Sequence, residues 1–456
     1  MAPSESRPRL GQVIGLALPI MGSMFTGIAM LIVDGIVCGH IPDNGRSLTA
    51  LGFGVQIWFI LDVPAAVFDV GTVALASRAH GAGDTDRVNR VVAQSAQIAF
   101  LAGAVVAVFG ALMGDHLFRL LGASPEVATQ GASYLKMLMI AFPASYVADG
   151  CLAPALRSVG NARLPFLCGI ASNLLNAVLA YALVFGHFGL PEMGIVGAGL
   201  ATAISRVASL LVMLVAIRAR GVGGLIVRLR GVAIDRPIVG EILRVGLPNL
   251  VEQLTFFGSM TAFFWILARV DQTSVAAHTI GARVAGLLLV PAFGVSMATG
   301  ALVGKALGAG SVDHARHLLR LSLVAVTAIM VPIALATYAT SYWIAAAYDV
   351  DPGSVLEGYT VSWLHLIALS IVLQGLMLVF EGLLSGAGAT RTVMKINLLA
   401  NLGLRLTLAA VLALGTNLGA VGVWLSWPAA LVVQLPIAFI AYRRGRWAVT
   451  GVTVAS

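Results

Sequence analysis

Charged residues are scarce in this chain. Asp, Glu, Lys and Arg make up 11% of its 456 residues, whereas 59% are hydrophobic, and the mean hydropathy is +0.94. Soluble domains carry roughly 25% charged residues. The scarcity excludes a soluble globular protein and predicts a polytopic membrane protein that is embedded in a lipid bilayer.

Cysteines are few and catalytic motifs are missing. The three cysteines, Cys38, Cys151 and Cys168, lie in apolar stretches without metal-ligand spacing, so we interpret them as small core residues. The chain contains no HExxH motif, no GxSxG motif and no phosphate-binding loop. We therefore expect neither an enzyme nor a metal centre or organic cofactor.

The basic residues are spread in a way that is typical of membrane proteins. The formal net charge is +8, but Lys and Arg lie in short links between apolar stretches, which argues against a nucleic-acid partner. Of the 28 basic residues, 21 lie in the termini and alternate links, Arg7, Arg228 and Arg230 among them, whereas the other links hold three. The positive-inside rule predicts that both termini lie in the cytoplasm. The balance of 25 arginines to 3 lysines is consistent with a bacterial protein, which we expect in the inner membrane. The first apolar stretch has no cleavage site, so we expect an uncleaved signal anchor.

Twelve apolar stretches are long enough to span a bilayer as helices. We predict an all-α fold with twelve transmembrane helices, at about Leu10–Gly39, Leu48–Ala76, Val91–Met113, Tyr134–Leu156, Pro165–His187, Ile195–Ile217, Ile238–Ala268, Val275–Val303, Leu318–Thr340, Tyr359–Leu384, Met394–Leu414 and Leu418–Tyr442.

The two halves of the chain repeat one another. Residues 73–83 (VALASRAHGAG) align with 300–310 (GALVGKALGAG) at an offset of 227, and 156–163 (LRSVGNAR) align with 384–391 (LSGAGATR) at an offset of 228. The repeat predicts two parallel six-helix lobes, residues 1–220 and 238–456, joined by a cytoplasmic linker at 221–237. Two such lobes can rock to open a site to either side of the membrane in turn.

Prolines recur at equivalent positions of the repeat. Pro19 matches Pro248, and Pro64 matches Pro291. Because proline removes a backbone donor and disfavours a straight helix, we expect bends in the first two helices of each half. These bends act as hinges or as static kinks.

Asp34 is the one acidic residue of the first span. An ionisable group at membrane depth is costly and marks an ion or proton site by default. The alternative is a carboxylate that is hydrogen-bonded between helices for packing alone.

Several motifs together resemble one transporter family. They are LPIM and VDGIVCGHI in the first span, ALASRAHGAGD with its copy ALVGKALGAGS, LRSVGNARLP, NLLNAVLAYALVFG and GIVGAGLATAISR. This combination is similar to the multidrug and toxic compound extrusion (MATE) family, and most like its DinF-like prokaryotic branch. The resemblance implies two six-helix lobes in a V, antiport coupled to protons or sodium, and export of drugs or metabolites.

The resemblance also assigns residues in the N-terminal half. It implies that Asp34 and Asn176 bind the coupling ion, but the aspartate that the family commonly carries four residues after the asparagine is Ala180 here. Asp62 and Asp69 are candidates to replace it, since seven residues of helix place them on one side. The alternative is that they pair with a buried arginine such as Arg206.

The C-terminal half holds a second set of candidates. Family members often carry a glutamate in the seventh helix, so Glu252, with Gln253 beside it, is expected in the C-lobe cavity. If the coupling ion is sodium rather than a proton, it is expected at either Asp34 or Glu252. Met30 and Phe256 are candidates for a soft apolar wall of the substrate cavity, although such residues are more often plain core.

Two further acids lie toward the predicted cytoplasmic ends of their helices. We expect Asp149 to pair with Arg157 and Glu381 with Arg391, rather than to act as gates. The interior acids outnumber the interior bases, so organic cations are the expected substrates of a monomeric cation-coupled exporter. The alternative is a flippase for lipids or lipid-linked saccharides, supported by the interior bases Lys136, Arg206, Arg283 and Arg405.

Overall fold

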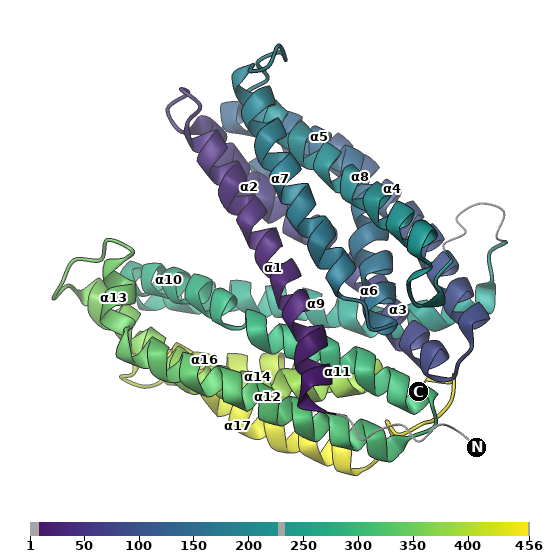
Figure 1. Cartoon of the computed structure of the whole chain (residues 1–456). Helices are drawn as coiled ribbons and strands as arrows, with labels where there is room; N and C mark the ends of the chain where they lie inside the picture. The colour runs from purple at the N-terminus through teal and green to yellow at the C-terminus, as the bar shows by residue number, and fades with distance from the viewer. Residues whose placement is uncertain (1–8, 227–232, 455–456) are drawn as a thin grey trace. The chain divides into compact units, whose positions relative to one another are not determined.

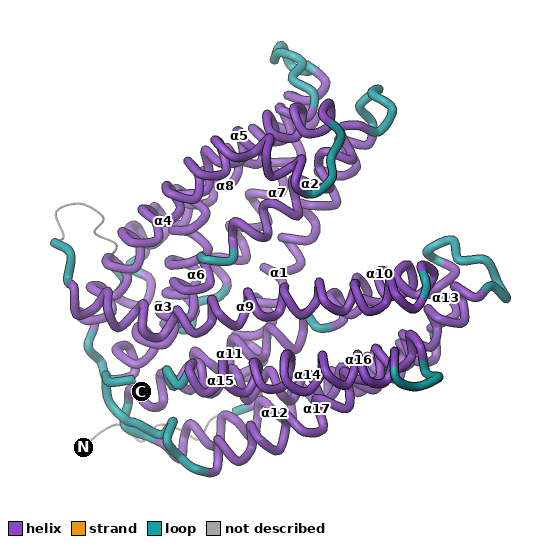
Figure 2. Tube along the Cα trace, turned by 180° about the vertical axis from the view of Figure 1, so that it is seen from behind, coloured by secondary structure: helices purple, strands orange, loops and turns teal. Residues whose placement is uncertain are grey.

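A computed structural model of the chain describes residues 9–226 and 233–454, and within these ranges the regular structure is entirely helical (Figures 1 and 2). Eleven of the described helices are long and apolar enough to cross a membrane, and a bent helix pair forms a twelfth span if it is counted as one. The predicted all-α polytopic fold is confirmed. Arg7, Arg228 and Arg230, which entered the charge count, lie outside the described residues.

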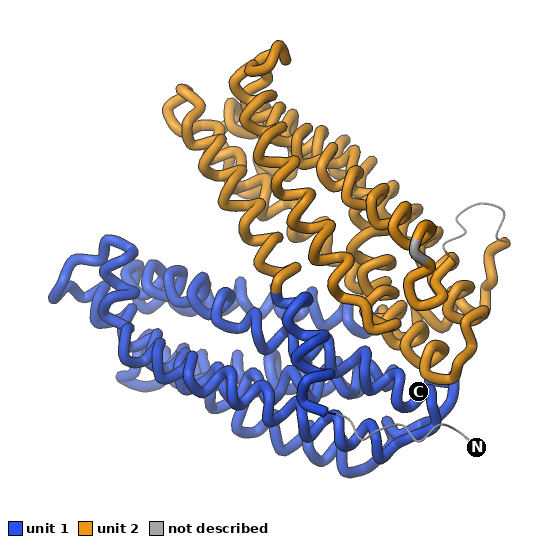
Figure 3. The backbone as a smooth tube through the Cα atoms, viewed as in Figure 1, with its two compact units in different colours: residues 1–21, 247–456 blue, residues 22–246 orange. Residues whose placement is uncertain are grey.

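The chain divides into two compact units (Figure 3). Unit 2 is Gly22–Gly246, and unit 1 combines Met1–Met21 with Leu247–Ser456. The divisions fall inside α1 (Leu10–Gly39) and α9 (Arg236–Val270), within three residues of the prolines at positions 19 and 248. The repeat-based lobe boundaries at 220 and 238 stay a prediction.

Unit 2 is a bundle in which α4 packs along α5, and α8 packs along both α5 and α7. Its remaining elements, in chain order, are α2 (Arg46–Asp62), α3 (Ala65–Gly81), α4 (Thr85–Leu120), α5 (Pro125–Val147), the π-helical η1 (Ala148–Leu152), α6 (Ala153–Ser158), α7 (Arg163–Phe185), α8 (Ile195–Arg220) and the short 3-10 turn η2 (Val222–Gly224).

Unit 1 is organised around α14, which contacts α10, α11, α12 and α17. Its elements, in chain order, are α10 (Gln272–Leu288), α11 (Val290–Gly308), α12 (Val312–Ala339), α13 (Ser341–Ala346), α14 (Val355–Gly386), α15 (Thr390–Leu398), the π-helical η3 (Leu399–Arg405), α16 (Leu406–Leu414) and α17 (Gly419–Arg443).

The second predicted span of each half is broken where its proline lies. Pro64 separates α2 from α3, and the axis of α3 is bent by 44° from that of α2. In unit 1, α10 ends at Leu288 and α11 begins at Val290, with Pro291 in its first turn. Proline is tolerated in the first turn of a helix because the missing N–H has no intrahelical partner there. The expected bend is therefore found in unit 2, and the second span of unit 1 is interrupted at the same place. The first helix of each half, α1 and α9, continues through its proline.

The repeat is visible in matched polar contacts between helices. In unit 2, Thr72 of α3 shares a 2.5 Å hydrogen bond with Ser95 of α4, and both residues are buried. In unit 1, Thr299 of α11 donates to Ser322 of α12 at 2.8 Å. Both residues are shifted by 227 positions, the same offset that the sequence shows. Each unit thus joins the equivalent helix pair with the same buried hydroxyl contact.

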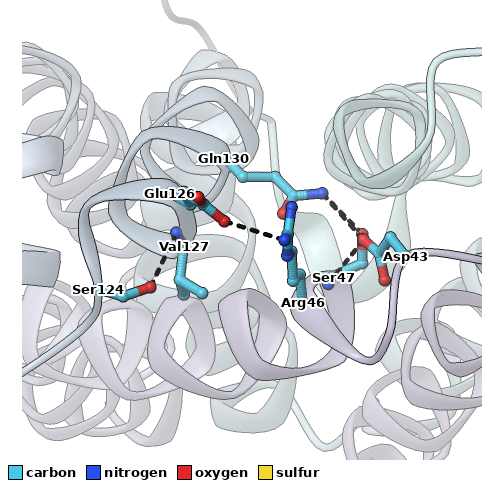
Figure 4. A network of polar contacts seen from close by, with 7 residues as sticks. All are labelled: Asp43, Arg46, Ser47, Ser124, Glu126, Val127 and Gln130. Carbon is cyan, nitrogen blue, oxygen red and sulfur yellow. Dashed lines mark hydrogen bonds and ion pairs between the residues drawn. The ribbon is translucent and has the colours of Figure 1, made fainter.

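A second matched contact lies at the start of the bent span. Figure 4 shows Asp43, before α2, accepting hydrogen bonds from Ser47 and from Gln130 of α5, while Arg46 pairs with Glu126 at 3.2 Å. Burial alone would raise the pKa of Asp43, but the hydrogen bonds from Ser47, Gln130 and the backbone outweigh it, so the pKa lies below its usual value. The counterpart in unit 1 is Asp271, which caps α10 through Ser274 N and accepts from Tyr359 of α14.

The link after α8 is tied to α4 where it is described. Asn89 accepts from Ile226 N at 2.8 Å, and the buried amide of Gln94 donates to Ala233 O and accepts from Asp235 N. The main chain on both sides of residues 227–232 is therefore hydrogen-bonded to one helix.

The three cysteines are free and buried, as predicted for core residues. Cys151, in η1, donates to Val92 O of α4.

Candidate functional site

The first site is built around Asp34, which α1 places inside unit 2. The residue is only 3% exposed, and its carboxylate accepts a hydrogen bond from Thr202 of α8 at 3.1 Å. No described residue forms an ion pair with it. A buried carboxylate without a counter-ion is costly, which favours a site that binds a proton or a small cation.

Asn176 of α7 completes this group. Its side-chain amide lies 3.1 Å from Asp34 Oδ1, and in the orientation that places the nitrogen there it donates to the carboxylate. The amide oxygen then faces the backbone N–H and the hydroxyl of Thr202 at 3.3 and 3.0 Å. Asn176 is fully buried and Thr202 is 5% exposed. The structure thus brings the two predicted residues together and adds Thr202.

The helices that carry this group approach one another closely. Asn173 donates to Thr26 O of α1 at 2.6 Å, and Ser172 donates to Ser205 O of α8 at 3.0 Å. A Cβ atom at Gly169 would lie 2.7 Å from Thr26 Oγ1, which is closer than real contacts allow. A larger residue there would force the Thr26 side chain to move, so glycine allows α7 to pack this closely against α1.

The Thr202 hydroxyl has more acceptors than hydrogens. It lies 3.1 Å from both Asp34 Oδ2 and Ala198 O, yet it can donate only once. When the carboxyl is protonated, the hydroxyl can accept from it and donate to Ala198 O; when it is ionised, the hydroxyl can donate to the carboxylate. The oxygens of these residues and of Asn176 also match the hard ligands that alkali cations take. The group suits either a proton or sodium.

Ala180, in place of the family aspartate, lies in an apolar cluster. It is fully buried with Leu183 and Ala201, and Val37 of α1 packs against them. No carboxylate replaces it in the cluster. The second polar group at Asp34 is the Thr202 hydroxyl, which sequence reasoning missed because a threonine in an apolar helix is common and carries no charge.

Asp62 and Asp69 do not share a helix face, so that prediction was wrong. Asp62 ends α2 and Asp69 lies in α3, with the bend at Pro64 between them. Asp69 pairs with Arg157 at 2.5 Å. Asp62 lies within electrostatic range of Arg206. Whether either acid takes part in ion binding stays a prediction.

The expected partners of Asp149 and Glu381 were also wrong. Asp149, in η1, pairs with Arg206 of α8 at 3.3 Å, because the π-helical turn shifts the register that the α-helical count assumed. The Arg206 guanidinium carbon lies 4.5 Å from the ring centroid of Trp58. Glu381 faces Asn397 and Glu252 rather than Arg391.

Unit 1 contains a second group of polar residues, around Glu252 of α9. Asn397 of α15 donates to Glu252 Oε1 and accepts from Gln434 of α17 at 2.5 Å. Asn397 is 5% exposed and Gln434 is 6% exposed. Two carboxyls, Glu252 and Glu381, thus share one amide. Such close carboxyls repel one another when both are ionised, so the group favours a bound proton or cation.

The remaining candidates differ in exposure. Met30 of α1 is 7% exposed and belongs to the interior of unit 2, whereas Phe256 of α9 is 46% exposed and meets Phe257 edge to face. Gln253 is partly buried. Their role in substrate binding stays a prediction.

A comparison with models of known protein families identifies the family of this chain. The family model described as MatE matches the chain twice, over residues 19–182 and 248–411. The chain belongs to the MatE family. The two matches are shifted by 229 positions, which confirms the repeat inferred from the sequence.

Named relatives and solved structures agree with this assignment. The MatE chain is 26% identical to a protein of Thermotoga maritima named "Probable multidrug resistance protein NorM", over 98% of this chain and 95% of the relative. It is 28% identical to "Multidrug resistance protein PmpM" of Pseudomonas aeruginosa, over 90% and 85% of the two chains. The assignment to the DinF-like branch stays a prediction.

The fold is also that of solved transporters. A structure titled "Outward-facing conformation of a multidrug resistance MATE family transporter of the MOP superfamily" superposes with a TM-score of 0.86, at 24% identity and over 96% of both chains. The protein is therefore a multi-span membrane protein with the MATE fold.

Proposed function

We propose that the protein is a proton- or sodium-coupled antiporter that exports organic cations by alternating access. Asp34, Asn176 and Thr202 bind the coupling ion in unit 2. The single observation that carries the proposal is the Asp34 carboxylate, which is buried among neutral hydrogen-bond partners and forms no ion pair with any residue in the described ranges.

The charges inside the spans favour cationic substrates. Asp69 and Asp149 are neutralised by arginines, whereas Asp34, Glu252 and Glu381 have only neutral hydrogen-bond partners among the described residues. An excess of unpaired carboxyls attracts cations. The relatives named as multidrug resistance proteins support small organic substrates for this chain as well.

We place the protein in the bacterial inner membrane as a monomer, with both termini in the cytoplasm. The orientation rests on the distribution of Lys and Arg over the links.

The flippase alternative loses most of its basis. It relied on four bases inside the spans, but Lys136 and Arg283 are exposed rather than buried within their units, and Arg206 is paired with Asp149. The Nε of the fourth base, Arg405, has no hydrogen-bond partner among the described residues.

The proposal is tested in proteoliposomes that hold either wild type or Asp34→Asn. We expect wild type to transport a cationic dye in exchange for protons or sodium ions that flow down an imposed gradient. The variant should lose this coupling, because the asparagine side chain has no charge with which to bind a proton or a cation. Asp313→Asn is the matched control, since its carboxylate is 92% exposed on α12.

If Asp34→Asn couples as well as wild type, Asp34 is a packing residue and the proposed site is wrong. If neither gradient moves a panel of cations with wild type while a fluorescent lipid analogue crosses the bilayer, the flippase function replaces the antiporter.

A further inference from the structure

One face of α17, the last span of the chain (yellow in Figure 1), is a continuous row of exposed apolar side chains. Val432, Val433, Phe439 and Ile440 are 46–60% exposed, and Pro436 between them is exposed as well. Residues spaced by three, four and seven positions lie on the same face of a helix. We call this row the apolar stripe; within a bilayer such a face contacts lipid acyl chains.

The apolar stripe ends in arginines. Arg443 and Arg444 follow Phe439 and Ile440 by four residues, so they continue the same face, and both are exposed. The Arg443 guanidinium carbon lies 5.9 Å from the ring centroid of Phe439. The 25 residues of α17 make a helix about 38 Å long, which exceeds the hydrocarbon core of about 30 Å. The arginines at its end therefore reach the level of the lipid headgroups.

A third arginine, Arg446, is held beside this end by the segment that follows α17. Trp447 is only 2% exposed; its ring stacks on Tyr442 with centroids 5.6 Å apart, and its Nε1 donates to Tyr442 O at 2.8 Å. Further along, Gly451 N donates to Leu307 O of α11 at 3.0 Å. Arg446 is exposed between these two attachments. The three arginines thus belong to one docked surface of unit 1.

This surface has no acid to neutralise it. None of the three arginine side chains forms an ion pair or a hydrogen bond with a residue in the described part of the chain. Basic residues at this end serve to orient a membrane protein, but that role leaves room for acidic partners. In unit 2, for example, Arg87 pairs with Glu241 at 2.8 Å. The end of α17 instead keeps its positive charge available to an external anion.

The chemistry of the surface selects its partner. Guanidinium groups match the oxygens of a phosphate with two parallel hydrogen bonds, and basic clusters directly beside a transmembrane helix attract anionic lipids. An inorganic phosphate ion or an acidic protein segment would leave the apolar stripe without a partner. A phospholipid covers both parts, because its phosphate and its acyl chains are joined in one molecule.

We propose that Arg443, Arg444 and Arg446 bind the headgroup of an anionic phospholipid, whose acyl chains lie along the apolar stripe of α17. The lipid belongs to the leaflet on the side of the C-terminus, and it contacts unit 1. This inference names a partner of the membrane-embedded protein and does not depend on the proposed antiport.

The test is a native mass spectrometry titration of the purified full-length protein in detergent, with phosphatidylglycerol or with phosphatidylcholine of identical acyl chains. We expect wild type to bind phosphatidylglycerol more tightly. The triple variant Arg443→Gln, Arg444→Gln and Arg446→Gln should raise the Kd of phosphatidylglycerol more than about tenfold, because three charges near the headgroup are lost. The Kd of phosphatidylcholine should change less than about twofold.

A matched triple variant controls for net charge. Arg316→Gln, Arg320→Gln and Arg391→Gln remove the same charge from other exposed arginines of unit 1, and they should leave the Kd of phosphatidylglycerol within about twofold of wild type. Glycerol phosphate carries the phosphate without acyl chains, so it should not displace the bound lipid at an equal concentration.

Single variants guard against a triple variant that does not fold, as judged by gel filtration and the melting temperature. Arg444→Gln and Arg446→Gln each keep two of the three charges that orient the end of the chain. Each should raise the Kd of phosphatidylglycerol about fivefold, again with little change for phosphatidylcholine.

The inference is wrong if the variants at the end of α17 bind phosphatidylglycerol as tightly as wild type, or if the control triple variant weakens binding equally. It is also wrong if wild type shows no preference for the anionic lipid, since the arginines then only orient the chain. Displacement by glycerol phosphate would point to a phosphate site in place of a lipid site. Lipid binding is measured without any ion gradient, so these outcomes are independent of the Asp34 experiment.

Discussion

At the scale of single residues, the acidic side chains within the spans are of two kinds, which differ in whether their partners are charged or neutral. Asp69 and Asp149 are paired with arginines, so their charge is compensated permanently. Asp34 and Glu252 accept hydrogen bonds from neutral amides and a hydroxyl. Neutral partners stabilise a carboxylate while leaving it free to take up a proton or cation, so the second kind suits exchange during transport.

The Thr202 hydroxyl gives a prediction at this scale. Thr202→Val keeps the shape of the side chain but removes a hydrogen bond to Asp34, which is worth about 1.5–3 kcal/mol for a charged acceptor. We expect gradient-driven dye efflux to fall about tenfold or more, while Thr202→Ser, which keeps the hydroxyl, retains most of the rate. The initial rate of efflux from proteoliposomes measures this, and an unchanged rate for the valine variant would show that the hydroxyl has no part in coupling.

The sequence indicated only part of this chemistry. Asp34 could be found because a lone carboxylate in a long apolar run is conspicuous, and the resemblance added Asn176. Thr202 could not be found, since its contact depends on how α8 packs against α1. The pairs Asp149–Arg206 and Asp69–Arg157 were missed for a physical reason, namely that a π-helical turn and a helix break change which side chains face one another.

At the scale of elements, three spans of unit 1 carry both an acidic layer and a basic aromatic layer. On α9 the order is Glu252 then Phe263, and on the α15–α16 span it is Asn397 then Arg405. On α17 the order is reversed, with Trp427 before Gln434. Seven to eleven residues of helix separate the layers, which is about 10–17 Å along the spans. An acidic layer and a basic aromatic layer are thus built from the same helices.

The contact between Asp43 and α5 predicts a dependence of stability on pH. The pKa of Asp43 is lowered in the folded protein, so its ionised form adds stability that is fully present above the unfolded value of about 4 and is lost as the pH falls through the folded value. We expect Asp43→Asn to lower the melting temperature by about 1–3 °C at neutral pH, and the difference to shrink below about pH 4.

Thermal melts of detergent-solubilised protein at several pH values measure this effect. Asp313→Asn is again the control, because its exposed carboxylate should contribute little at any pH. A difference between wild type and Asp43→Asn that stays constant down to the lowest pH would contradict the role of the charge.

The helices themselves were largely readable from the sequence. Length and hydropathy fixed α1 and α17 to within a residue or so of the predicted bounds, because a span must cover the bilayer with apolar side chains. The π-helical segments η1 and η3 were not predicted. Their residues are ordinary helix formers, and the extra residue per turn is imposed by packing rather than by local preference.

At the scale of the whole molecule, the two units share a scaffold but not a site. The hydroxyl contacts Thr72–Ser95 and Thr299–Ser322 occupy equivalent positions. Asp34, in contrast, corresponds to Phe263 at the offset of 229, and Asn397 has no equivalent amide. The repeat therefore conserves what holds each bundle together, while each unit has acquired different polar groups.

The division between the units gives a prediction at this scale. It falls within three residues of Pro19 in α1 and Pro248 in α9. Proline weakens a helix at that point, so we expect Pro19→Ala and Pro248→Ala to slow transport severalfold with little change in melting temperature. Pro332→Ala is the control, because Pro332 lies within α12, well inside unit 1. Equal transport rates for all three variants would show that these prolines are static kinks.

The burial of the three free cysteines has a practical consequence. Because aqueous reagents cannot reach these thiols, the folded protein should react very little with maleimide labels. A single cysteine introduced at an exposed loop of each unit can thus carry a spin label or fluorophore in the otherwise native sequence. The distance between the two labels can then be measured before and after the coupling ion and a substrate are added. Such measurements follow conformational change during the transport cycle without removing any native cysteine.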